Sequence, residues 1–122
     1  MKFIELKEFL NEFKKLSKKY KSLEEDFKDF KLSIEDDPTW KELPSEHIVN
    51  ISWLGDNIDG DFYKVRRFFC KSLKSKWDLR IVYKFSNESN SIEFCEIEFI
   101  EIFHKNTKEN HDIKRIKKYY SK

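Results

Sequence analysis

The sequence predicts a single α+β domain, in which two amphipathic helices are followed by a run of strands and a short basic helix. Three observations predict this class: apolar residues recur at helical spacing early in the chain, they alternate with polar residues at 79–85, and 122 residues suit one core. We expect residues 1–122 to form a helical hairpin packed on a mainly antiparallel, twisted sheet of about four strands.

The N-terminal third is expected to form a short strand at 2–5 and then the two helices of the hairpin. Ser22 and Glu25 have the spacing of a capping box that opens the second helix, and Pro38 requires that helix to end before it. A short link between the helices predicts an antiparallel arrangement. The apolar stripes are Leu6, Phe9, Leu10, Phe13, Leu16 and Tyr20 in the first helix, and Leu23, Phe27, Phe30 and Ile34 in the second.

After a loop at 39–46, strands are expected from about Ile48, at 62–70 and at 79–85, where β-branched and aromatic residues concentrate. Strict alternation at 79–85 predicts a core face and an accessible face. The core face is expected to carry Leu79, Ile81, Tyr83 and Phe85, and the accessible face Arg80, Val82 and Lys84.

The last third is expected to contain one or two strands at 91–103 and a helix at 109–120. Cys95 and Glu96 mark a plausible break in the strand region, and a change of apolar parity near Phe99 also indicates an irregularity. In the helix, the apolar spacing predicts that Ile113, Ile116 and Tyr120 face inward.

Charge is distributed unevenly along the chain, although the formal net charge is only +2. Residues 61–84 carry 8 basic and 2 acidic groups, and residues 104–122 carry 7 basic and 2 acidic groups. Between them, residues 85–103 carry 5 acidic groups and no basic group. If the two basic segments meet in the fold, they form a positive patch that can hold phosphates. The alternative is a solvated charged face without a ligand.

Several classes of protein are disfavoured by the sequence. No apolar stretch is long enough to span a membrane, and we expect a cytoplasmic protein that does not contact a membrane. In a reducing compartment, Cys70 and Cys95 are expected to be free, buried thiols. His47, His104 and His111 lack zinc-ligand spacing relative to the cysteines, so we expect neither a metal nor a cofactor.

Four segments of the sequence are similar to a known protein family: FKKLSKKYKSLEEDF, FYKVRRFFCKSLKSK, DLRIVYKF and IEFIEIFHKNTKENHDIKRIKKYY. Their order and content resemble the RelE/ParE superfamily of toxins from bacterial type II toxin–antitoxin pairs. The resemblance implies a RelE-like fold, a cognate antitoxin as partner, and action as a ribosome-dependent mRNA endoribonuclease that inhibits translation without a metal. Such enzymes activate a ribose 2′-hydroxyl against the adjacent phosphate, which requires a base, an acid and charge stabilisation.

Candidate residues for these roles follow from their chemistry and their place on the strands. Arg80, Arg66 and Lys64 are expected to hold phosphate, because an Arg fork matches it and pairing of the two strands would bring them together. His104 is the preferred proton-transfer group, since histidine titrates near neutral pH. The residues expected to contact RNA are Lys71, Lys74, Lys76, Lys84, Lys105 and Lys108.

Two alternative functions remain open at this point. A ParE-like protein would share the fold but inhibit DNA gyrase by protein contact, and a non-enzymatic interaction module would use its charged segments only to dock a partner. Tyr119 and Tyr120 are possible base-stacking or proton-donating residues, although helical spacing predicts that at least one belongs to the core.

Overall fold

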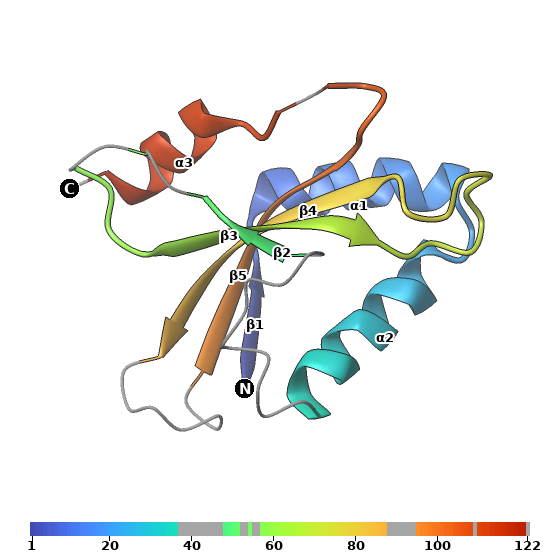
Figure 1. Cartoon of the computed structure of the whole chain (residues 1–122), viewed down its shortest axis with the longest axis horizontal. Coiled ribbons are helices and arrows are strands. Elements are labelled where there is room, and N and C mark those ends of the chain that lie inside the picture. Colours follow the sequence, from blue (N-terminus) through green and yellow to red (C-terminus); the bar gives the residue numbers. More distant parts are fainter. Residues whose placement is uncertain (37–47, 52–53, 55–56, 88–94, 109, 122) are drawn as a thin grey trace.

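The computed structural model describes residues 1–36, 48–51, 54, 57–87, 95–108 and 110–121, and these residues form three helices and five strands (Figure 1). The expected α+β class is confirmed. The predicted loop at 39–46, His47 and the first part of the segment at 91–103 lie outside the described residues. The element order is β1 (Lys2–Glu5), α1 (Lys7–Lys19), α2 (Leu23–Asp36), β2 (Ile48–Asn50), β3 (Asp61–Phe68), β4 (Leu79–Asn87), β5 (Cys95–His104) and α3 (Ile113–Tyr120).

The sheet is mixed and has the strand order β1-β5-β4-β3-β2. β1 pairs with β5 in parallel, while the remaining neighbours are antiparallel. The sheet therefore has five strands, where the sequence predicted about four. The strand expected at 2–5 is confirmed as β1, and it joins the sheet as the fifth strand by pairing with β5. The sequence did not predict this pairing, because a partner so distant along the chain leaves no local pattern.

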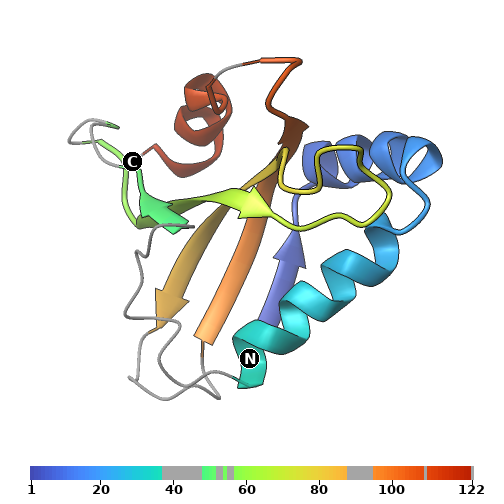
Figure 2. The same ribbon diagram turned by 45° about the vertical axis from the view of Figure 1, so that its right-hand side comes forward.

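α1 and α2 cover one face of the sheet through aromatic side chains. The ring of Phe27 on α2 meets Phe99 of β5 edge-on at 4.8 Å between centroids, and Phe9 on α1 stacks on the same ring at 5.5 Å. α1 and α2 contact each other through Phe13 and Phe27, whose ring centroids are 5.1 Å apart. The two helices diverge from their linked ends (Figures 1 and 2), so the antiparallel hairpin that the sequence predicted is not confirmed. Each helix also makes its own contact with the sheet.

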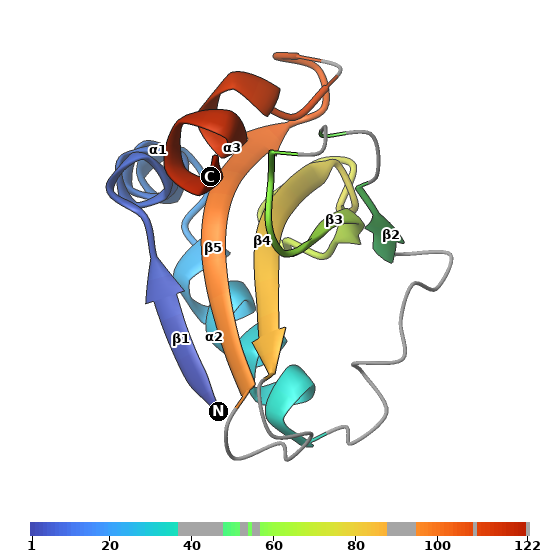
Figure 3. The ribbon, with the colours of Figure 1, turned by 90° about the vertical axis from the view of Figure 1, so that its left-hand side faces the viewer.

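α3 covers part of the opposite face (Figure 3). Its Ile116 is fully buried against a second apolar cluster that includes Val82, Ile100 and Phe103. The sequence placed Val82 on an accessible face, and that prediction is wrong: its side chain is 0% exposed. Alternation reports which residues share a face of a strand, but not whether a distant helix covers that face. Ile113 was expected to face inward and is exposed.

β5 contains a bulge at Ile100. The adjacent β4 residues Val82 and Tyr83 pair with Glu101 and Phe99, which leaves Ile100 without a partner residue in the register. This confirms the irregularity expected near Phe99. No break occurs at Cys95, which begins the strand and pairs with Asn87. The extra residue directs both Ile100 and Glu101 toward α3, which places a carboxylate in a buried layer.

Candidate nucleic-acid interface

A second irregularity, in β3, positions two arginines side by side. Val65 pairs with Ile81 and Phe68 pairs with Leu79, so two residues of β3 stand opposite one residue of β4. The two residues are Arg66 and Arg67, and the one opposite is Arg80. Val65 and Phe68 are buried in the core, whereas Arg66 and Arg67 are exposed. The bulge thus gathers three guanidinium groups at one edge of the core.

These side chains line an open cavity of about 390 Å³, here called the basic cleft. Three arginines and one lysine face a single carboxylate there. Lys105 comes from the second basic segment of the sequence and the arginines from the first, so the two segments do meet at this point. The residues of the basic cleft are Arg66, Arg67, Trp77, Asp78, Arg80 and Lys105.

The Asp78 carboxylate binds Lys105 and Ser75 and does not balance the charge of the three arginines. Its Oδ1 lies 3.2 Å from Nζ of Lys105 and accepts a hydrogen bond of 3.1 Å from the Ser75 hydroxyl. Burial by itself would raise the pKa of Asp78, but the hydrogen bonds from Lys105 and Ser75 outweigh burial and lower it. The Asp78 carboxylate is therefore ionised and already engaged at neutral pH.

The arginines repel one another across the cleft. Burial lowers the pKa of Arg80, Asp78 raises it, and the charges of Arg66 and Arg67 lower it further. Nη1 of Arg80 donates to the Trp77 carbonyl at 2.9 Å, which fixes its direction. Among the residues that the structure describes, no carboxylate forms an ion pair with Arg66 or Arg67. An incoming anion would relieve this repulsion.

Lys64 extends the positive region from the arginines toward His111. Burial lowers the pKa of Lys64, and the charges of Arg66 and Arg80 lower it further. Burial also lowers the pKa of His111, with additional lowering by Lys64 and Lys108. Nδ1 of His111 is buried and has no hydrogen-bond partner among the described residues. His111 is therefore a neutral imidazole at pH 7, next to fixed positive charge.

His104 lies apart from the basic cleft. Its Cα partner is Leu79, whose side chain belongs to the core under α1 and α2. The imidazole stacks on Tyr20 at 6.4 Å between centroids, and its Nε2 lies 3.9 Å from Oδ2 of Asp78. It borders a separate cavity of about 600 Å³. The structure thus places the expected proton-transfer group and Arg80 in different cavities that share Asp78.

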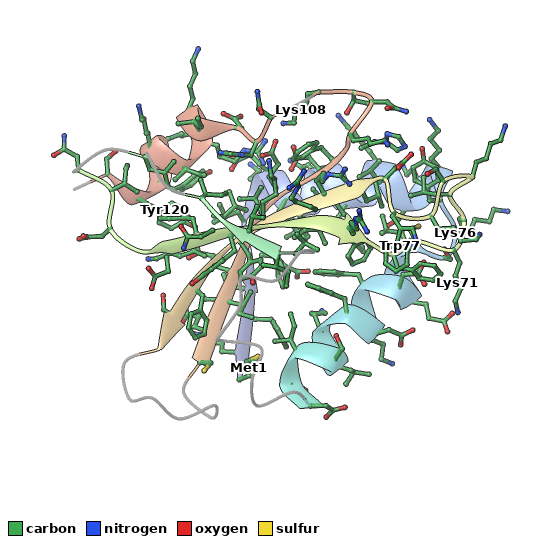
Figure 4. All side chains as sticks on the ribbon, in the orientation of Figure 1. Met1, Lys71, Lys76, Trp77, Lys108 and Tyr120 are labelled. Carbon is green, nitrogen blue, oxygen red and sulfur yellow. The ribbon has the colours of Figure 1, made fainter. Side chains whose placement is uncertain are left out.

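The other lysines that were expected to contact RNA are dispersed over the molecule. Lys71 and Lys76 lie near Trp77 at one end of the molecule, and Nζ of Lys76 donates to the Lys71 carbonyl at 2.9 Å (Figure 4). Lys74 lines the cavity of His104. Lys84 and Lys108 lie elsewhere: Lys84 has its Nζ 5.0 Å from the Tyr120 ring centroid.

Lys108 is engaged in a buried ion pair with Glu101, which is only 1% exposed. The other oxygen of Glu101 accepts a hydrogen bond of 2.8 Å from the backbone N–H of Asp112, at the start of α3. Nζ of Lys108 also lies 5.0 Å from the ring centroid of Phe103. Lys108 therefore offers little charge to a ligand.

Arg115 ties α3 to α1 and to the β5 bulge. Its guanidinium donates to both carboxylate oxygens of Glu12, at 2.8 and 2.9 Å, and to the Ile100 carbonyl at 2.8 Å. The hydrogen bond with Glu12 raises the pKa of Arg115. Of the two tyrosines considered for stacking, Tyr119 donates to Glu8 and Tyr120 packs edge-on against Phe62. Neither ring lines the basic cleft.

Sequence reasoning missed Arg67, Trp77 and Asp78. The only available signal was that Arg67 and Trp77 adjoin residues already selected in the basic segment. A regular strand would place Arg66 and Arg67 on opposite faces, and only the bulge places both beside Arg80.

Comparisons with protein-family models, with curated proteins and with solved structures found no match to this chain. Within the described residues, no group of three or more His, Cys, Asp and Glu side chains has a metal-binding arrangement. Cys70 and Cys95 are both buried and are not joined by a disulfide bond. None of the helices in the described part of the chain combines the length and apolarity required to cross a membrane.

Proposed function

We propose that this protein is a toxin of the RelE/ParE kind that acts on mRNA through the basic cleft. The observation that carries the proposal is the assembly of three arginines and a lysine around one engaged carboxylate. Guanidinium groups bind phosphate through paired hydrogen bonds. Among the residues that the structure describes, Arg66 and Arg67 form no ion pair with a carboxylate, so no such pair has to be broken when phosphate binds. The RelE-like fold of the proposal is supported by the order of two helices, consecutive strands and a C-terminal helix.

In the proposed reaction, a 2′-oxygen attacks the adjacent phosphorus and the 5′-oxygen of the next nucleotide leaves. The base removes the 2′-hydroxyl proton, and the acid gives a proton to the leaving oxygen. Arg66, Arg67 and Arg80 would stabilise the charge that develops on the phosphate oxygens. We propose His111 in place of His104 as the base, because its buried Nδ1 has no hydrogen-bond partner among the described residues and is thus not already engaged. The charge of Lys64, which also acts on the pKa of His111, is in turn influenced by Arg80.

The proposal includes a cytoplasmic site of action at the ribosome and an antitoxin as partner. An antitoxin segment with acidic residues would be attracted to the cleft and would exclude RNA from it. A second candidate is the ParE-like inhibition of gyrase. One observation favours it: His104 and Arg80 do not share a cavity, and inhibition by protein contact needs no catalytic group.

Arg80→Ala tests the proposal most directly. We expect ribosome-bound mRNA to be cleaved about a hundredfold more slowly, because a cation at the transition state is lost. The free energy of unfolding should change by no more than about 0.5 kcal/mol, since the guanidinium is not part of the apolar core. Lys14→Ala, an exposed change on α1, is the control and should retain full cleavage.

The same assay assigns the proton-transfer group and separates the two candidates. His111→Ala should reduce cleavage strongly, while His104→Ala should retain it. Cleavage by Arg80→Ala at the wild-type rate would refute the role of the cleft in catalysis. If the wild-type protein leaves mRNA intact but stalls gyrase on DNA, the gyrase candidate replaces the nuclease.

A further inference from the structure

Two large aromatic side chains lie exposed beside the basic cleft. Trp77 is 49% exposed and Phe69 is 36% exposed, and their ring centroids are 5.0 Å apart. A folded protein gains free energy by burying such rings, so an adjacent exposed pair is a feature of binding surfaces. We call this pair the aromatic platform.

The segment that carries the platform is anchored to α2. Ser22 and Ser72 exchange two hydrogen bonds of 2.8 Å, each backbone N–H donating to the other hydroxyl. Asp26 accepts from the backbone N–H of Lys71 at 2.9 Å. Ser22 donates its hydroxyl to Asp26 at 2.7 Å, so the capping box predicted with Glu25 is replaced by this anchor. The turn between Phe69 and Trp77 is thus held at the start of α2 by hydrogen bonds between side chains and backbone N–H groups, which pre-organises the segment that carries the two rings.

The aromatic platform stands between two cavities. On one side is the basic cleft, and on the other is a cavity of about 310 Å³, here called the aromatic cavity. Trp77 and Arg67 line both cavities. The residues of the aromatic cavity are Asp26, Asp29, Phe30, Ser33, Arg67, Phe68, Phe69, Lys71 and Trp77.

We propose that the aromatic platform stacks one unpaired base of an RNA strand whose adjacent phosphate lies in the basic cleft. This inference rests on the proposed function, because it uses the same cleft for the phosphate. The charge of the cleft selects a polyanion. The planes of the two rings are tilted by 55° to each other, so a base stacks on the face of one ring, that of the more exposed Trp77, with Phe69 beside it. A basic groove next to an exposed aromatic ring is the combination used for single-stranded nucleic acids. The backbone carbonyl of Trp77 also accepts the hydrogen bond from Arg80, so the phosphate-binding group is held at the residue that carries the ring.

The wall of the aromatic cavity favours bases that donate hydrogen bonds. Ser33 uses its hydroxyl proton on the Phe30 carbonyl at 2.7 Å, which leaves its oxygen as an acceptor. Asp29 adds carboxylate oxygens, which only accept when ionised, while the buried Asp26 on the same wall already accepts from Ser22 and Lys71. Guanine, adenine and cytosine carry an exocyclic amino group and uracil does not. The site should therefore bind an amino-bearing base more tightly than uracil.

A pair of short RNA probes tests the platform separately from the cleft. One probe is a fluorescein-labelled single-stranded octamer without uracil, and the other has one internal base removed while its ribose and phosphates remain. Binding to the full-length protein is measured by fluorescence anisotropy at low salt. Trp77→Ala should weaken binding of the intact octamer about tenfold, in line with the loss of one stacked base, and should bind both probes equally.

Two further variants, Trp77→Phe and Arg80→Ala, distinguish loss of base stacking from loss of phosphate binding. Trp77→Phe should restore most of the affinity for the intact octamer, and Arg80→Ala should weaken both probes by the same factor. If Trp77→Ala binds the intact octamer like the wild type while Arg80→Ala does not, the platform is wrong and the phosphate site stands. If Arg80→Ala binds both probes like the wild type, the proposed function fails at the cleft. Binding of an acidic peptide at the platform without discrimination between the probes would also overturn the inference.

Discussion

Arg115 meets a matched carboxylate, whereas Arg80 lies beside two further arginines. Around Arg115, the Glu12 carboxylate and the Ile100 carbonyl satisfy the guanidinium, and α3 is thereby fixed to α1 and β5. Around Arg80, the single carboxylate of Asp78 is shared with Lys105. The pKa values move in opposite directions: that of Arg115 is raised by its partner, and that of Arg80 is lowered by burial and by its arginine neighbours.

The two arginines show how a paired charge that stabilises the fold differs from a clustered charge that can bind a ligand. Burying a cation costs free energy unless a partner offsets the lost hydration, so a fully paired arginine reports a structural role. A cluster of like charges costs stability and persists where a ligand offsets the repulsion. The two basic segments look alike in sequence, but in the second one Lys108 and Arg115 are paired with the carboxylates of Glu101 and Glu12. At the β3–β4 end, Arg66 and Arg67 are exposed to solvent.

The largest effect that distinguishes the two regions should be on stability. Arg115→Ala leaves the Glu12 carboxylate and the Ile100 carbonyl without their partner, and we expect the free energy of unfolding in urea to fall by about 3 kcal/mol. Lys114→Ala, an exposed neighbour on α3, should change it by less than about 0.5 kcal/mol. RNA affinity of the folded Arg115→Ala protein should stay at the wild-type value. A stable variant that no longer bound RNA would reverse the assignment of roles.

A smaller effect is expected on salt dependence in the basic cleft. Arg66→Ala and Arg67→Ala should each reduce the slope of log affinity against log salt by about 0.7, the value for one phosphate contact on a single strand. Their unfolding free energies should stay within about 0.5 kcal/mol of the wild type, because both side chains are exposed. Lys117→Ala on α3 is the matched control. An unchanged slope in both arginine variants would mean that the cleft does not contact phosphate.

The smallest effect concerns His111 and pH. Because the charge of Lys64 helps to lower the pKa of His111, Lys64→Met should raise that pKa in an NMR titration, while Lys114→Met should not. In the wild type the folded-state pKa lies below the ordinary value of 6.5, so the unfolded chain takes up the proton first. Stability should therefore fall as the pH drops below about 6.5, and it should fall less in Lys64→Met. An identical pKa in the two proteins would remove Lys64 from the surroundings of His111.

Much of the local structure was predictable, because periodicity is a local property of the chain. The stripe from Phe9 to Leu16 became α1, and the alternation at Leu79 and Ile81 identified the core face of β4. The parity change near Phe99 correctly located the β5 bulge. The burial of Val82 was not predictable, since α3 begins at Ile113 and reaches that face only through the fold.

For the candidate site, the sequence alone determined which residues carry positive charge. They lie in two segments rich in Lys and Arg, which include Arg66, Arg80 and Lys105. Tertiary structure decided which of these charges remain available to a ligand. The bulge in β3 places Arg67 beside Arg80, and the bulge in β5 turns Glu101 inward toward Lys108. The alternation of side chains along β5 places His104 on the face that α1 and α2 cover, away from Arg80. The physical reason is that charge belongs to a residue, whereas pairing, burial and repulsion depend on neighbours that the chain brings together only on folding.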